Sequence, residues 1–225
     1  MPLSQATLDF MTENRFEDSL DWFHAHKREY ENLVLAPLAA LVEELAPVMR
    51  SLDPGLIVEP RVDRCISRIY RDTRFSKDKF RYRDVMWIVF MRDKKLYHGP
   101  PAFFFEFSPR GFRHGCGYYQ ARPEVMAAGR ALILKNAPVF RKARRILEAP
   151  SPFSLEGDAY KRTRHADRTP ALRAWLDRKN WYVVRQGTDP SIVFAPDWGR
   201  VLAEDFTRLK PVYDFFCAAE ARARS

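Results

Sequence analysis

Cysteine is scarce in this sequence, which has three among 225 residues, at Cys65, Cys116 and Cys217. They are odd in number, lie far apart and form no C-x-x-C pair, which argues against a disulfide scaffold and against a zinc knuckle. Few and widely separated cysteines are typical of proteins in a reducing compartment, so a cytoplasmic location is expected. The first residues, Met-Pro-Leu-Ser-Gln, have no basic n-region and no apolar h-region, so no signal peptide is expected.

Long apolar runs and common catalytic motifs are missing as well. No stretch approaches the roughly 20 apolar residues needed to span a bilayer, so no membrane partner is expected. The sequence has no G-x-x-x-x-G-K-[ST] phosphate loop and no G-x-S-x-G nucleophile motif. On a helix, His24 and His26 would point about 200° apart and could not share a metal ion. We therefore assign no metal site, no cofactor and no catalytic residue, and leave open whether the protein is an enzyme.

The composition is nevertheless that of a folded protein. Hydrophobic residues make up 46% of the chain and aromatic residues 14%, which argues against disorder. A chain of this length can bury roughly 70% of the surface that its unfolded form exposes. We expect a single domain over residues 1–225, and the proline-rich link near residue 150 is the one plausible seam.

Helical signals dominate both ends of the chain. Ser4 is suited to cap a short helix through about Glu13, and Asp18-Ser19 opens a longer helix. Pro37 predicts a kink in that helix, which should end near Arg50. Further helices are expected over residues 123–136, 138–147 and 169–178, and from Asp197 nearly to the chain end.

Strand signals occupy the middle of the chain. The turn at 108–111 should join two strands into an antiparallel hairpin. A short strand pair is also expected within residues 153–164, around Gly157. The remaining expected strands and hairpin partners are residues 84–91, 102–107, 112–119 and 182–186. These elements predict an α+β fold, with a mainly antiparallel sheet flanked by helices, a long N-terminal helix and a C-terminal helix.

The most unusual stretch is residues 61–92. It holds ten basic and four acidic residues, a net charge of +6 out of +9 for the whole chain. Apolar residues alternate with the arginines over 62–70, and we interpret this part as a strand, although a helix would also place several arginines on one stripe. Residues 72–83 are polar and should form a structured loop.

We interpret this stretch as an anion-binding site. Arginine offers a planar fork that binds phosphate or carboxylate at two points, and lysine adds a point charge. The expected ligand is a small phosphorylated or polycarboxylate molecule. The expected contacts are Arg64, Arg68, Arg71, Arg74, Lys77 and Lys79, with Tyr70 and Tyr82 as stacking or hydroxyl contacts and Lys161 and Arg162 as further candidates.

Three other interpretations stay open. Basic residues interleaved with aromatic ones also suit a groove for nucleic acid, with bases stacked on the rings. The arginines could instead meet an acidic protein surface, which would make the chain a structural or protein-interaction module. They could also form a solvated face on which each pairs with a nearby aspartate or glutamate. The sequence does not indicate an oligomeric state.

The segment Arg68-Ile-Tyr-Arg-Asp-Thr-Arg-Phe-Ser-Lys-Asp-Lys79 resembles the signature of a bacterial conserved-hypothetical family, domain of unknown function 2461. Its early W-F-x-x-H-K-x-x-Y motif is similar to Trp22-Phe-His-Ala-His-Lys-Arg-Glu-Tyr30, and its glycine–aromatic segment is similar to Gly115-Cys-Gly-Tyr-Tyr. Lys161-Arg162 falls where the family has a K-R pair. Phe80-Arg81-Tyr82 departs from the family's T-P-Y or S-P-Y. The resemblance implies no activity and supplies no catalytic residue.

Overall fold

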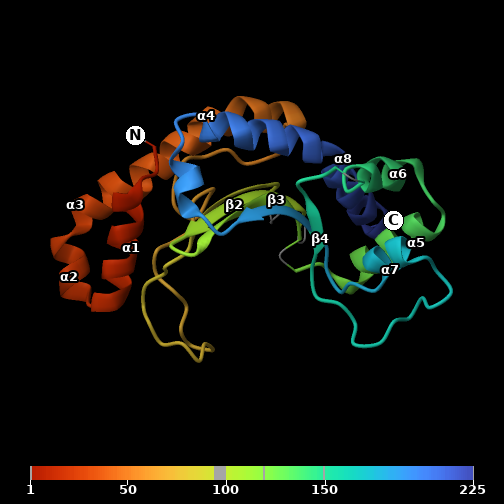
Figure 1. The fold of residues 1–225 in the computed structure, drawn as a ribbon, viewed down its shortest axis with the longest axis horizontal. Coiled ribbons are helices and arrows are strands. Elements are labelled where there is room, and N and C mark those ends of the chain that lie inside the picture. The colour runs from red at the N-terminus through yellow and green to blue at the C-terminus, as the bar shows by residue number, and fades with distance from the viewer. Residues whose placement is uncertain (1, 94–99, 119, 149, 225) are drawn as a thin grey trace. The chain divides into compact units, whose positions relative to one another are not determined.

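The computed structural model describes residues 2–93, 100–118, 120–148 and 150–224 (Figure 1). Two compact units make up the chain. The first comprises residues 2–90, Phe104–Arg113 and Gln186–Ala203, and the second comprises the described parts of Met91–Phe103, His114–Arg185 and Glu204–Ser225. Each unit is assembled from segments distant in sequence, so the division does not fall at the proline-rich link near residue 150. The single-domain interpretation stays a prediction.

The first unit begins with helix α1 (Gln5–Glu17). The Ser4 backbone N–H donates to Thr7 Oγ1 at 3.1 Å, which satisfies a backbone group at the helix start. The predicted start at Ser4 is confirmed, and the helix extends four residues beyond the predicted end. Asp18 then adopts a left-handed conformation (φ 45°), which ends the helix and turns the chain.

The predicted long helix after Ser19 is a series of helical segments. The Nδ1 of His26 donates to the Trp22 carbonyl at 2.8 Å, and the backbone of His26 leaves the helical region (φ −102°, ψ 17°). Pro37 has no N–H for the carbonyl four residues earlier, and a wider π-helical turn comes directly before it. The segments are α2 (Leu20–Ala25), α3 (Lys27–Tyr30), η1 (Glu31–Leu35) and α4 (Ala36–Leu52). The helix thus breaks at His26, where no interruption was predicted.

The helical run Lys27–Leu52 is long and apolar enough to cross a membrane, with a mean hydropathy of 1.5 over 18 residues. A core helix of a soluble protein passes the same test, so length and hydropathy are weak evidence here. Val34, Leu38, Val42 and Leu45 are fully buried along this run. The expectation of no membrane partner stays a prediction.

The basic stretch is not the strand that the alternation predicted, nor a helix. Asp63 adopts a left-handed conformation (φ 68°), which folds the chain back so that Val62 pairs with Ile66. Beyond this turn only Ile66 pairs with a residue of β1 (Met86–Met91), namely Ile88. Isolated residue pairs therefore take the place of the predicted strand. The Asp72–Arg83 segment is irregular, and this part of the prediction is confirmed.

The sheet has five antiparallel strands in the order β1-β2-β3-β5-β4. The α+β prediction and the hairpin are confirmed. The predicted strand pair around Gly157 is wrong. Ser154, which precedes Gly157, pairs with Val184 of β5, and the segment after Gly157 forms no strand that could pair with it. The strands after β1 are β2 (Ala102–Ser108), β3 (Gly111–Gly117), β4 (Ser154–Glu156) and β5 (Tyr182–Gly187). Tyr119, at the end of the predicted 112–119 strand, lies outside the described residues.

Gly111 opens the second strand of the hairpin with a backbone that favours glycine (φ 128°). A Cβ at this position would lie 2.1 Å from the carbonyl oxygen of Gly187. The hairpin turn and the end of β5 can therefore approach each other only because residue 111 has no side chain.

The remaining helices are α5 (Pro123–Leu134), α6 (Pro138–Arg145), α7 (Pro170–Leu176), the short η2 (Pro190–Phe194) and α8 (Trp198–Arg224). Proline occupies the first turn of α5, α6 and α7, where its missing N–H costs no helical hydrogen bond. In the second unit the rings of Trp175, Trp181 and Phe215 lie within 5.7–6.4 Å of one another and form an aromatic core.

A buried histidine–aspartate pair also lies in the second unit. His114 Nε2 is 2.8 Å from Asp205 Oδ2, and Arg185 Nη1 reaches the same oxygen at 3.0 Å. Burial lowers the pKa of His114, although Asp205 opposes this. Burial raises the pKa of Asp205, but His114 and Arg185 outweigh it and hold the pKa below its ordinary value. The folded pair is therefore a neutral imidazole and an ionised carboxylate.

This pair predicts a loss of stability in mild acid. Between about pH 7.5 and 5.5 the unfolded chain takes up a proton at His114, near its ordinary pKa of about 6.5, and the folded chain does not. The urea midpoint should therefore fall as the pH drops through this window. In His114→Gln the fall should be smaller, and equal falls in the two proteins would contradict the assignment.

Candidate functional site

A polar loop of the first unit carries much of the basic stretch. Tyr70 pairs with Tyr82, and the Arg71 N–H donates to the Arg81 carbonyl at 2.7 Å. These contacts close the base of the loop over residues 72–80 (Figure 1, yellow-brown), and none of the residues in this loop is fully buried. The loop therefore has no apolar core of its own and depends on polar contacts for its shape.

Four predicted arginines each contact a carboxylate. The exposed ones, Arg68 and Arg74, form two-point pairs with aspartates close in sequence. The four pairs are Arg64–Glu59 (2.5 Å), Arg68–Asp63 (2.7 Å for Nη2), Arg71–Asp78 (2.5 Å) and Arg74–Asp72 (2.7 Å). The structure brings these arginines into one unit, but it supplies each with an anionic partner.

Two aspartates, Asp78 and Asp84, are each shared between arginines distant in sequence. Asp78 Oδ2 accepts from Arg15 on α1 at 2.6 Å as well as from Arg71. Asp84 Oδ2 is 3.8 Å from Arg15 Nε and 2.6 Å from Arg110 Nη1. We call this chain of five residues the Arg–Asp network. It contains three cations and two anions, so it keeps a net positive charge.

The network holds its aspartates ionised. The hydrogen bond from Arg15 is the largest cause that lowers the pKa of Asp78, to about 2, and the Phe80 N–H and Arg71 add to it. Burial raises the pKa of Asp84, but Arg110 and Arg15 outweigh it. Carboxylates with such pKa values are not proton donors near neutral pH. The network therefore acts through charge rather than through proton transfer.

The predicted lysines have no carboxylate partner in the described part of the chain. Lys77 is exposed, and Lys79 Nζ donates to the Thr73 carbonyl at 3.0 Å. Lys161 and Arg162 are also exposed, but they belong to the second unit. These last two therefore belong to a different unit from the loop.

The two predicted tyrosines differ in exposure. Tyr82 is buried, and its hydroxyl donates to the Ser19 carbonyl at 3.3 Å. Burial and the neighbouring Tyr70 raise its pKa to about 12. Tyr70 is 40% exposed, and its ring lies 5.4 Å from that of Phe23. Tyr70 is thus the accessible ring, and Tyr82 supports the base of the loop.

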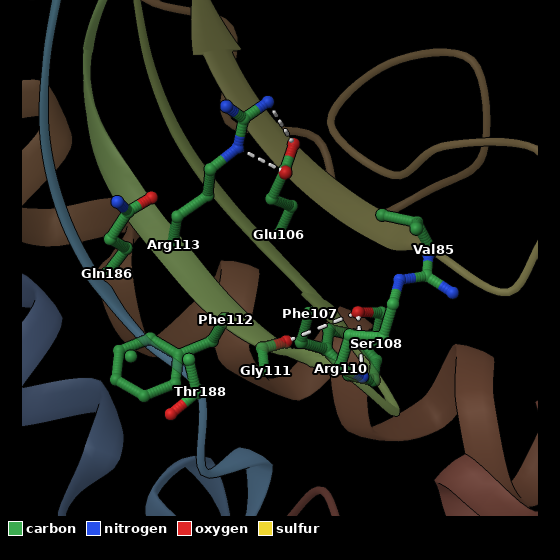
Figure 2. A pocket seen from close by; sticks show the side chains of 11 residues that line it. Val85, Glu106, Phe107, Ser108, Arg110, Gly111, Phe112, Arg113, Gln186 and Thr188 are labelled. Atoms are coloured by element: carbon green, nitrogen blue, oxygen red, sulfur yellow. Dashed lines mark hydrogen bonds and ion pairs between the residues drawn. The ribbon is translucent and has the colours of Figure 1, made fainter. Parts of the chain in front are cut away.

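A pocket of about 560 Å³ lies at the turn of the β2–β3 hairpin in the first unit (Figure 2). Arg113 and Glu106 point toward each other across the two strands, with Arg113 Nη2 3.2 Å from Glu106 Oε2. Arg110 lines the same pocket and joins it to the Arg–Asp network through Asp84.

The sequence analysis missed Arg15, Arg110 and Arg113. Glu106 and Arg113 could have been found as an opposite-charge pair across a hairpin. No sequence pattern indicated a role for Arg15, because its aspartate partners lie more than 60 residues away in sequence. Among the described residues, no group of three or more His, Cys, Asp or Glu could hold a metal ion.

Replacing Asp78 by asparagine should loosen the loop. Asp78→Asn removes the charge that binds Arg15 and Arg71, so trypsin should cleave the loop faster in the native protein. Asp72→Asn is the matched control, because it changes the net charge equally but contacts only Arg74 within the loop. Equal cleavage of both variants, or no acceleration by Asp78→Asn, would refute the structural role of the network.

Comparison with known proteins gives a family but no described activity. A search among curated proteins found no match. A family model described as conserved hypothetical protein (DUF2461) matches residues 6–215, which is nearly the whole chain. The five strands, the basic loop and the hairpin pocket all lie within the matched region, and this protein belongs to that conserved hypothetical family.

Proposed function

We propose that this protein binds a small phosphorylated or polycarboxylate ligand at the basic loop of the first unit. The observation that supports this most is the excess of cations over carboxylates. The Arg–Asp network has three arginines for two aspartates, and Lys77 has no carboxylate partner among the described residues. A polyanion would relieve the repulsion between these cations.

The exposed ion pairs do not prevent binding. A pair at the surface contributes about 0–1 kcal/mol, whereas a hydrogen bond between charged groups in a bound complex contributes about 1.5–3 kcal/mol. The side chain of Arg68 is 65% exposed and that of Arg74 is 77% exposed. A ligand phosphate can therefore replace Asp63 or Asp72 as their partner at little cost.

The roles of the contacts follow from their burial. Arg71 is mostly buried and fixed by Asp78 and Ser76, so it orients the site. Lys77 and Lys79 supply mobile charge, and Arg64, Arg68 and Arg74 close on the ligand. Tyr70 is the accessible ring at the edge. No catalytic group is proposed.

Lys77→Gln/Lys79→Gln tests this site at little cost to the fold, because neither lysine makes an ion pair among the described residues and Lys79 loses one exposed hydrogen bond, to the Thr73 carbonyl. Pyrophosphate and citrate, used as probes, should raise the melting temperature of the wild type. The double variant should lose most of this shift at unchanged melting temperature without ligand. Lys142→Gln/Arg141→Gln in α6 is the control of equal charge change, and an equal loss there would show non-specific screening.

A second candidate function is binding of single-stranded nucleic acid. Phe75 is 94% exposed, Phe80 44% and Tyr70 40%, and all three lie between cations of the same loop. Exposed rings in a basic surface suit base stacking, which contributes about 1–3 kcal/mol per base. The phosphates would then meet the lysines and arginines of the loop.

A gel-shift titration separates this candidate from the first. Single-stranded DNA should be retarded, with affinity falling steeply as salt rises. Phe75→Ser should weaken binding by about fivefold to a hundredfold, the equivalent of one stacked base. Leu134→Ser is the control, because Leu134 is an exposed apolar residue of α5. No retardation at low salt, or equal binding by Phe75→Ser, would remove nucleic acid as the ligand.

A further inference from the structure

The second unit has a pocket of its own, about 350 Å³ in volume. The loop after β4 forms one wall through Tyr160 and Thr163, and helix α7 with the residues that follow it forms the other through Arg173, Asp177 and Arg178. The pocket reaches the lower end of the size range typical of small-molecule sites.

Cations outnumber carboxylates around this pocket. Arg130, Arg164, Arg173, Arg178 and Lys179 line it or contact its residues, and none of them makes an ion pair within the described residues. The arginines of the basic loop in the first unit are paired with carboxylates, so this is a different electrostatic situation. Three of the cations here, Arg130, Arg173 and Arg178, are half-buried, and half-buried charge without an ion pair is costly unless an anion compensates it.

Backbone carbonyls fix two of these arginines but do not neutralise them. Arg130 Nη2 donates to the Arg178 carbonyl at 2.6 Å, and its Nε donates to the Leu176 carbonyl at 3.0 Å. Arg178 donates to the carbonyls of Gly157 at 2.5 Å and Leu155 at 2.7 Å. Their positions are therefore set before any ligand arrives, and their charge remains.

Three of these cations lie around the ring of Tyr160. The Arg164 guanidinium lies 3.9 Å from the ring centroid, Arg130 lies at 5.7 Å, and Lys179 Nζ lies at 5.9 Å. The negative face of an aromatic ring attracts cations and partly offsets their mutual repulsion. The Tyr160 N–H donates to the Asp177 carbonyl at 2.8 Å, which fixes the backbone that carries this ring.

Asp177 is the one carboxylate of the pocket lining. It accepts the Thr163 hydroxyl and the Arg164 backbone N–H (3.0 Å). Burial raises its pKa, but these two hydrogen bonds, together with the charges of His165 and Arg173, outweigh it and lower the pKa. Asp177 is thus ionised, and each of its oxygens keeps a lone pair that can accept a ligand hydroxyl.

Arg173 offers free donors. It lines the pocket one helical turn before Asp177, and its guanidinium forms no hydrogen bond within the described residues. Its Nε has no accessible surface, so a bound acceptor would meet the terminal nitrogens Nη1 and Nη2. Arg173 and Asp177 therefore present an anion-binding donor and a hydroxyl acceptor in the same pocket.

We propose that this pocket binds a small hydroxylated phosphate ester, with its phosphate on Arg173 and Arg164 and a hydroxyl on Asp177. The site lies in the second unit, and it stands whether or not the basic loop of the first unit binds a ligand. Lys161 and Arg162, which are exposed on the same loop as Tyr160, add positive charge that attracts the ligand.

Isothermal titration of the full chain with glycerol 3-phosphate tests the proposal. The wild type should bind one equivalent saturably, and inorganic phosphate should bind at least about fivefold more weakly because it has no carbon-borne hydroxyl for Asp177. Equal affinity for the two probes would overturn the assignment of Asp177. No binding at about 10 mM ester would overturn the site.

Two variants locate the binding. Arg173→Gln and Arg164→Gln should each weaken binding about tenfold or more. Arg164 is exposed, so its replacement tests the site even if Arg173→Gln is unstable. Arg168→Gln is the matched control, because Arg168 pairs with Asp167 outside the pocket. Lys77→Gln/Lys79→Gln in the first unit should bind the ester normally, and a loss there with no loss in Arg164→Gln would move binding to the basic loop.

Discussion

Compensation of positive charge is the constraint on which both candidate sites depend. The chain carries a net charge of +9, and its arginines must be solvated, paired or supplied with an external anion. In the first unit, aspartates shared between Arg15, Arg71 and Arg110, and further carboxylates beside Arg64, Arg68 and Arg74, do this internally. Around Tyr160 in the second unit no carboxylate forms an ion pair with the described cations. The surface is therefore largely paired around the basic loop and unpaired around Tyr160.

The fold was largely predictable wherever a local signal sets the structure. Ser4 caps α1, proline occupies the first turn of three helices, and the turn ending at Gly111 joins β2 to β3. These are properties of a few neighbouring residues, so sequence alone suffices. The break at His26 was missed, because no proline, glycine or capping pattern marks it; there the Trp22 carbonyl accepts both the backbone N–H and the ring N–H of His26.

The basic stretch shows where local patterns fail. Its apolar residues alternate in sequence, but Cys65, Ile66 and Ser67 are buried in succession and Ile69 follows Ile66 by three residues, which is not the period of a strand. The chain takes a left-handed turn at Asp63, and only isolated pairs form. Alternation of residue types therefore does not establish which side chains are buried. It does not report whether the backbone has a partner along its length, which is decided by tertiary structure.

The density of positive charge in the sequence located the predicted site, but the sequence did not identify all the carboxylates that pair with its arginines. Sequence counting found the arginines and their near aspartates, because Arg68–Asp63 and Arg74–Asp72 join residues at most five apart. It could not find Arg15, whose contact with Asp78 spans 63 residues. The cations around Tyr160 were equally hidden, since Arg130 precedes that ring by 30 residues. Net charge per segment therefore indicates where an anion is attracted. Only the three-dimensional arrangement of carboxylates determines where one is needed.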